Sequence, residues 1–100
     1  MVNKKQLAID FANSLNRHEI EKIILFGSVA RGEDTKDSDI DILIITNNKS
    51  KIIDDVYSKV GKIILELDEY LSVKIIRKNN YEQVKNSHIM TSIEKEGILI

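Results

Sequence analysis

The feature that most constrains the fold is an aliphatic run with two carboxylates at its start. Residues 42–45 are all Ile or Leu, a pattern typical of a buried strand, and Asp39 and Asp41 stand two residues apart where the run begins. Alternate residues of a strand face the same side, so these carboxylates repel each other. A divalent cation held by both would remove the repulsion, and their hard oxygen atoms suit Mg²⁺ or Mn²⁺. The other interpretation is a solvated strand start with two ordinary polar residues.

The composition is that of one ordinary globular domain, which we place over residues 1–100. Hydrophobic residues make up 42% and charged residues 31% of the chain. The net charge of −1 gives no indication of a nucleic-acid partner. The sequence has no cysteine and only two, widely separated histidines, which argues against a disulfide framework and a zinc site.

The N-terminal segment lacks the unbroken apolar core of a signal peptide. No stretch approaches the roughly 20 apolar residues of a membrane span. We therefore expect a cytoplasmic chain that is not attached to a membrane.

Hydrophobic periodicity predicts an α+β fold in the order α-β-β-α-β-α. We expect helices over about residues 3–16, 50–69 and 79–97, and strands over about residues 20–26, 39–46 and 71–76, with a small edge strand at residues 98–100. Ser50 is the expected N-cap of the long helix, and Gly97 the expected residue after the last one. A small mixed β-sheet with the helices packed on one face is the economical arrangement.

Gly27 and Ser28 follow the first strand and open a link of about twelve residues, long enough for a helical turn or an open loop. Backbone N–H groups at such a junction, with a serine hydroxyl, suit a phosphate group, and glycine lets the phosphate approach closely. By itself the pair is also common in ordinary turns.

The Gly-Ser pair, ten intervening residues and Asp-Ile-Asp together make a more specific pattern. The stretch LFGSVARGEDTKDSDIDILI resembles the DNA polymerase β-like nucleotidyltransferase superfamily. It is especially similar to the minimal nucleotidyltransferase (MNT) branch, in which GS, ARG and SDIDxLI recur together. The order of elements and the tail SIEKEGILI extend this similarity over nearly the whole chain.

The resemblance implies a reaction and a set of site residues. The reaction is transfer of a nucleoside monophosphate from an NTP, with ATP the first candidate, to an acceptor hydroxyl. Gly27 and Ser28 would hold the β- and γ-phosphates, and Arg31 would contact the triphosphate, although an exposed arginine in a polar loop is often only solvated. Asp39 and Asp41 would be the catalytic carboxylates and would bind Mg²⁺ or Mn²⁺.

Lys74 departs from the family pattern. The superfamily usually supplies a third carboxylate from the next strand, where MNT-like chains tend to have Val-Asp-Leu-Val, whereas residues 73–76 here are Val-Lys-Ile-Ile. Three explanations stay open. Lys74 replaces the charge of one metal ion, another acid substitutes, or the chain binds nucleotide without efficient transfer. The nearest substitutes in the sequence are Glu66, Asp68 and Glu69.

The resemblance also implies a protein partner, because MNT-like chains are commonly paired with a small helical HEPN protein as antitoxin and toxin. The chain would then modify or mask that partner. The alternative function is a catalytically degenerate nucleotide-binding or partner-binding module that acts by complex formation. The sequence leaves open whether the chain forms a homo-oligomer.

Four further residues are expected to have no part in the chemistry. Tyr81 is expected in the core, and His88 in a packing or surface role. Lys4 and Lys5 are expected on a solvated face.

Overall fold

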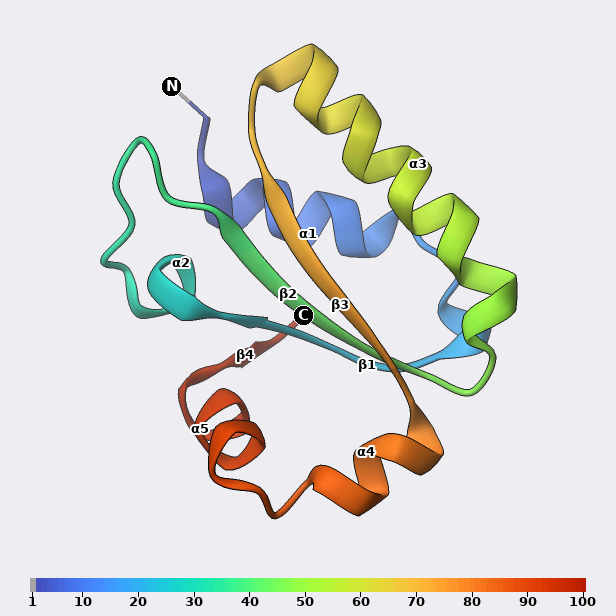
Figure 1. The fold of residues 1–100 in the computed structure, drawn as a ribbon. Coiled ribbons are helices and arrows are strands. Elements are labelled where there is room, and N and C mark those ends of the chain that lie inside the picture. The colour runs from blue at the N-terminus through green and yellow to red at the C-terminus, as the bar shows by residue number, and fades with distance from the viewer. Residues whose placement is uncertain (1) are drawn as a thin grey trace.

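The computed structural model describes residues 2–100, which form a four-stranded sheet covered by helices (Figure 1). The elements in chain order are α1 (Lys4–Asn13), a 3-10 turn (Arg17–Glu19), β1 (Ile20–Phe26), α2 (Gly27–Arg31), β2 (Ile40–Thr46), α3 (Lys49–Leu67), β3 (Leu71–Arg77), α4 (Lys78–Val84), α5 (His88–Glu96) and β4 (Ile98–Leu99). The α+β class and the order of the main elements agree with the expectation. The link after β1 forms a short helix, α2, followed by an open loop.

The sheet is mixed, with the strand order β3-β2-β1-β4. Strand β2 runs parallel to β3 and antiparallel to β1, and β1 is also antiparallel to β4. Residues 42–45 of β2 are at most 1% exposed. A strand that is covered on both faces has a continuous aliphatic sequence, which explains the run that first marked this strand.

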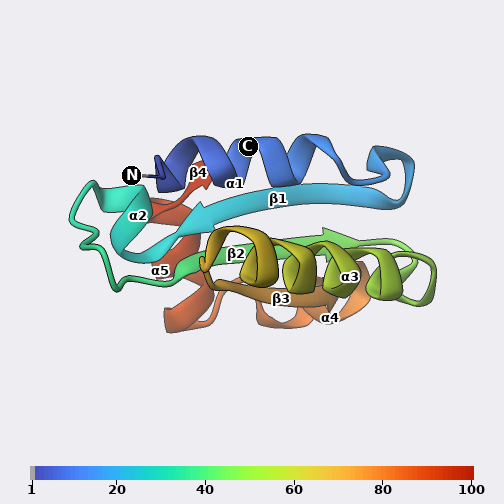
Figure 2. The ribbon, with the colours of Figure 1, turned by 90° about the horizontal axis from the view of Figure 1, so that it is seen from above.

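Helices cover both faces of the sheet, so the expectation that they all pack on one face was wrong for the last two. Helices α1 and α3 pack on the face that carries Ile44, where Val56 of α3 is buried. Tyr81 of α4 and Met90 of α5 pack on the opposite face, against Leu43. Figure 2 shows α1 and α3 on one side of the sheet and α4 and α5 beyond it. The reason is that β2 is apolar on both sides and needs cover on both.

The segment predicted as one C-terminal helix is divided into α4 and α5. Helix α4 ends at Val84, and Ser87 forms a new N-cap, whose side-chain oxygen accepts a hydrogen bond from the Met90 backbone N–H at 3.3 Å. Serine is a favoured N-cap residue because its hydroxyl satisfies a backbone donor of the first turn. The division lets the chain turn back so that α5 lies beside β1 and α2 (Figure 1).

The start of α3 also differs from the expectation, whereas the end of α5 agrees with it. Helix α3 has Asn48 at its N-cap position, and the expected cap, Ser50, lies within the helix and donates a hydrogen bond to the Asn48 side chain at 2.9 Å. Gly97 does follow α5, but its φ of −75° is not left-handed. A Cβ on Gly97 would collide with Ile24, so close packing against β1 is what requires glycine there. No helix within residues 2–100 combines the length and apolar character needed to cross a membrane.

Candidate functional site

The turn that begins α2 lies directly against the start of β2. Phe26, the last residue of β1, is paired with Asp41 in the antiparallel ladder, so the next residue, Gly27, comes beside the Asp41 side chain. Gly27 has a φ of +76°, and a Cβ at this position would lie 3.1 Å from Asp41 Cγ and closer still to a carboxylate oxygen. Both the backbone conformation and the lack of space therefore require glycine. The two halves of the sequence motif meet at this contact.

Asp41 stands beside this turn, and Asp39, two residues earlier, has a different environment. Asp39 is exposed and immediately precedes β2, whereas Asp41 is half-buried within the strand. Burial raises the pKa of the Asp41 carboxyl, and the charge of Asp39 raises it further. The charges of Lys74 and Arg31 act in the opposite direction. The two carboxylates therefore interact through space, as their spacing in the sequence indicated.

The chemistry of this pair fits one hard divalent cation. Carboxylate oxygens are the ligands that Mg²⁺ prefers, and Mg²⁺ usually takes only one or two of them, with waters and substrate phosphate oxygens in its other positions. A cation would also relieve the unfavourable charge on the half-buried Asp41. In the described part of the chain, no group of three or more His, Cys, Asp or Glu side chains is arranged to hold a metal ion.

Lys74 lies on the neighbouring strand, on the face that carries Asp41. In the parallel pairing of β2 with β3, Ser72 is opposite Asp41 and Lys74 is opposite Leu43. Lys74 is thus two residues further along the same face, where the resemblance led us to expect an acid. Its side chain is exposed and makes no hydrogen bond or ion pair with any residue from 2 to 100.

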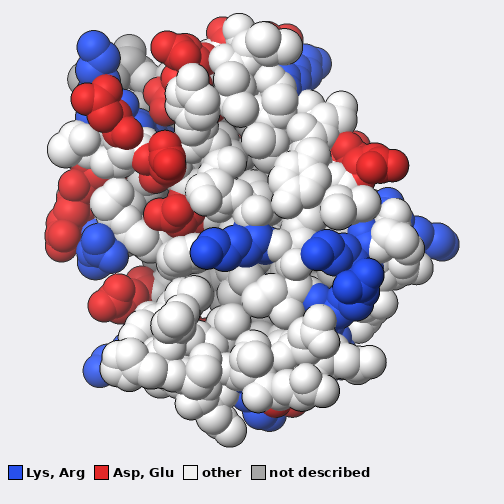
Figure 3. Space-filling model, in the orientation of Figure 1, with Lys and Arg blue, Asp and Glu red and all other residues white. Residues whose placement is uncertain are grey.

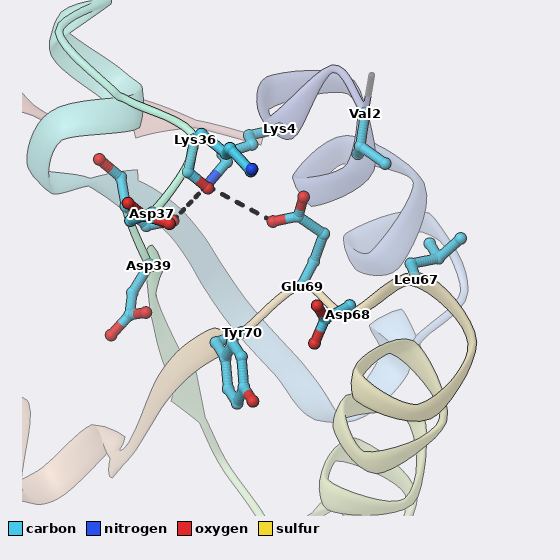
Figure 4. A pocket seen from close by; sticks show the side chains of 10 residues that line it. Val2, Lys4, Lys36, Asp37, Asp39, Leu67, Asp68, Glu69 and Tyr70 are labelled. Atoms are coloured by element: carbon cyan, nitrogen blue, oxygen red, sulfur yellow. Dashed lines mark hydrogen bonds and ion pairs between the residues drawn. The ribbon is translucent and has the colours of Figure 1, made fainter.

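The acids considered as substitutes lie at a separate pocket. Asp68 and Glu69 follow α3 and line a cavity of 560 Å³ together with Asp39, but Asp41 is not among its lining residues (Figure 4). The Glu69 carboxylate forms an ion pair with the Lys4 ammonium at 3.4 Å. Glu66 is exposed on α3. None of the three joins the two motif carboxylates in a three-acid group within the described residues.

Lys4 is buried, so its expected place on a solvated face was wrong. Its side chain is 6% exposed, and its ammonium donates to the Lys36 carbonyl at 3.0 Å, to the Ser38 carbonyl and to Glu69 (Figure 4). These bonds tie α1 to the loop immediately before Asp39. The sequence did indicate this burial, because Lys4 lies at helical spacing from Ala8 and Phe11 and therefore on the buried face of α1.

A second hollow, of 280 Å³, lies between α2 and α5; we call it the α2–α5 hollow. Its lining includes Gly27, Arg31, Lys74, His88 and Ser92. Because Gly27 also contacts Asp41, this hollow adjoins the Asp41 carboxylate. Figure 3 shows acidic side chains gathered over the loop before β2, and basic side chains in a row across the middle of the same face, over β3.

Arg31 and His88, which both line the hollow, have different surroundings. Arg31 forms ion pairs with Glu33 at 3.4 Å and with Glu96 at 3.5 Å. His88 is exposed at the start of α5, which agrees with its expected surface role but places it beside the motif residues. Sequence reasoning missed this neighbourhood, because α5 comes back to α2 only through the tertiary fold.

Comparison with known proteins decides the family. Residues 8–100 match the family model described as nucleotidyltransferase domain. The chain belongs to this family. The match spans far more of the chain than the motif, and it confirms the resemblance that the motif suggested.

Relatives of this nucleotidyltransferase domain occur in Methanocaldococcus jannaschii. One protein named "putative protein adenylyltransferase" is 38% identical, with 74% of this chain and 84% of the relative covered. Another of the same designation is 35% identical, with 84% of this chain and 80% of the relative covered. A crystal structure from Sulfolobus solfataricus, titled as that of a "putative nucleotidyltransferase", is 20% identical, with a TM-score of 0.46 over 97% of this chain and 75% of that chain.

Proposed function

We propose that this nucleotidyltransferase transfers AMP from ATP to a hydroxyl group of a partner protein, with Mg²⁺ or Mn²⁺ as cofactor. The observation that best supports the proposal is the contact between Asp41 and Gly27, which sets one motif carboxylate against the start of the Gly-Ser turn. The name that both relatives bear, "putative protein adenylyltransferase", supports AMP as the group transferred and a protein as the acceptor.

The proposed reaction is a displacement at the α-phosphorus of ATP. The acceptor oxygen forms a bond to this phosphorus, the bond to the oxygen that bridges to the β-phosphate breaks, and pyrophosphate leaves with the bonding electrons. The proton of the acceptor hydroxyl passes to solvent. Such transfers depend mainly on positioning and on stabilisation of phosphate charge.

The motif residues would bind either the cation or the phosphates. Asp39 and Asp41 would hold the divalent cation, which would supply neutralisation of charge on the phosphates. Gly27 lets a phosphate oxygen come close to the backbone, and the Ser28 hydroxyl donates a hydrogen bond to it. Arg31, at the end of α2, adds a positive charge beside the triphosphate.

We propose a helical HEPN-type protein as the partner, with this chain as the antitoxin that modifies it. The MNT resemblance supports this choice. In the test, the chain is incubated with Mg²⁺, the protein encoded by the neighbouring gene, and ATP labelled at either the α- or the γ-phosphate. The partner should gain label from α-labelled ATP only, and Asp39→Asn or Asp41→Asn should abolish the labelling. Label from γ-labelled ATP alone, or no label with any NTP and metal, would contradict the transferase.

Lys74 favours a second candidate, a degenerate module that acts by forming a complex. With a lysine where the family usually has an acid, the site has one carboxylate fewer for a second cation. This candidate predicts an equally tight complex with the partner for the wild-type chain and for the Asp39→Asn, Asp41→Asn double variant, and no labelling by either.

A further inference from the structure

We propose that Lys74 binds the phosphates of a nucleoside triphosphate whose triphosphate lies in the α2–α5 hollow. The inference rests on the proposed function, which requires a nucleotide at this site. It makes Lys74 a residue that takes part in substrate binding. An acid at this position would reach the phosphates only through a metal ion. Lys74 would instead contact the phosphates directly.

The position of Lys74 relative to the carboxylates is the first argument. Lys74 pairs with Leu43, which lies two residues beyond Asp41 on the same face of β2. With neighbouring strands about 4.8 Å apart and a rise of about 3.3 Å per residue, the Cα atoms of Asp41 and Lys74 are roughly 8 Å apart. A phosphate held beside Asp41 therefore comes within reach of a lysine side chain.

The distribution of charge in the hollow is the second argument. Arg31 already forms ion pairs with two carboxylates, Glu33 and Glu96, whereas Lys74 forms no ion pair within residues 2–100. Lys74 is therefore the cation of the hollow that no ion pair holds, and its charge acts only through space, on Asp41. His88 and Ser92 of α5 also line the hollow and offer additional polar groups. A polyanion with several phosphates matches this combination of a lysine free of ion pairs and nearby polar groups.

The competing explanation for Lys74 is that it prevents the edge strand β3 from pairing with another chain. Strand β3 is at one edge of the sheet, and lysine on an edge strand discourages pairing with another chain. This explanation predicts that neutralising Lys74 increases self-association and leaves nucleotide affinity unchanged.

The test measures the affinity of a fluorescent ATP analogue at constant ionic strength, once with a chelator and once with Mg²⁺. The variants are Lys74→Gln and Lys74→Asp, with Lys62→Gln as the matched control. Lys62 is an exposed lysine of α3, a helix that packs on the opposite face of the sheet. Gel filtration and thermal unfolding check the oligomeric state and the folding of every variant.

We expect Lys74→Gln to weaken binding about tenfold in the chelator, the loss of one charge-assisted contact, and Lys62→Gln to change it less than about twofold. Lys74→Asp should bind still more weakly in the chelator and should recover with Mg²⁺, because a third carboxylate then assists the cation. These measurements do not depend on transfer activity.

Two outcomes separate this inference from the function on which it rests. If the wild-type chain binds the analogue and labels its partner, but Lys74→Gln and Lys62→Gln bind equally well, the role of Lys74 is wrong and the transferase stands. If the wild-type chain binds no nucleoside triphosphate in either condition, the proposed function and this inference both fail.

Discussion

The Asp41 carboxylate lies against the backbone of Gly27, so closely that a Cβ on Gly27 would stand 3.1 Å from the Asp41 Cγ. This contact joins the turn after β1 to the start of β2. It fixes the carboxylate relative to the backbone that would receive a phosphate. The energetic cost of disturbing this contact can be measured by comparing Gly27 with Gly32, the other glycine of positive φ.

Gly27→Ala should be more harmful than Gly32→Ala. Both glycines have positive φ, +76° and +71°, but a Cβ on Gly32 would have no atom within 4 Å. Gly32→Ala should therefore lower the free energy of unfolding only by the backbone cost, about 1 kcal/mol. Gly27→Ala should lower it further and weaken binding of an ATP analogue, because the added methyl group displaces Asp41. Denaturant unfolding and nucleotide titration check both, and equal effects would contradict the contact.

Asp41→Asn should abolish transfer and leave the free energy of unfolding within about 0.5 kcal/mol of wild type when metal is absent. Burial and the Asp39 charge raise the pKa of Asp41 above its ordinary value of 3.8. The stabilising contribution of the protonated Asp41 is complete below its unfolded pKa and is lost as pH rises through its folded pKa. Asparagine avoids that loss, so the variant should gain stability relative to wild type as pH rises from about 3 to 7. A relative loss would show that the carboxylate is stabilised in the fold.

Lys4→Met should lower the free energy of unfolding by about 2–3 kcal/mol, because it leaves Glu69 and the Lys36 and Ser38 carbonyls without their shared donor. Lys5→Met is the matched control, since Lys5 is exposed on the same helix turn. Its effect should be close to zero. Hydrogen exchange should also show faster exchange in the loop before Asp39 for Lys4→Met only. Similar unfolding curves for the two variants would argue against the buried role of Lys4.

Tyr81→Phe should lower the free energy of unfolding by about 1–2 kcal/mol at neutral pH. The Tyr81 hydroxyl donates to the Glu94 carboxylate at 2.5 Å, which raises the pKa of Tyr81 to about 12 and lowers the pKa of Glu94. The contribution of Glu94 is present above its unfolded pKa and is lost as pH falls through its folded pKa. The difference between the two proteins should therefore shrink toward about pH 3, as measured by denaturant unfolding at each pH. A difference that is independent of pH would contradict a charge-assisted bond.

Much of the fold follows from local patterns. The aliphatic run at residues 42–45 predicts the strand β2. The helical spacing of Ile52, Val56 and Val60 predicts α3. The place where the C-terminal helix divides was missed, although Ser87 is a good N-cap residue, because helical periodicity continues past it. Lys4 was missed for a related reason. A lysine is assigned to solvent by its charge unless a buried partner such as Glu69 is known.

The sequence by itself determined the chemistry that is available: two carboxylates on one face of a strand, a Gly-Ser turn, and a lysine where the family usually has an acid. Only the tertiary structure decided how these groups face one another. It placed Gly27 against Asp41, left Lys74 without an ion pair among the described residues, and brought His88 to the same hollow as Gly27 and Lys74. The physical reason is that strand direction, register and the return of α5 arise from packing across the whole sheet. Local periodicity records which residues are buried, but not which of them meet.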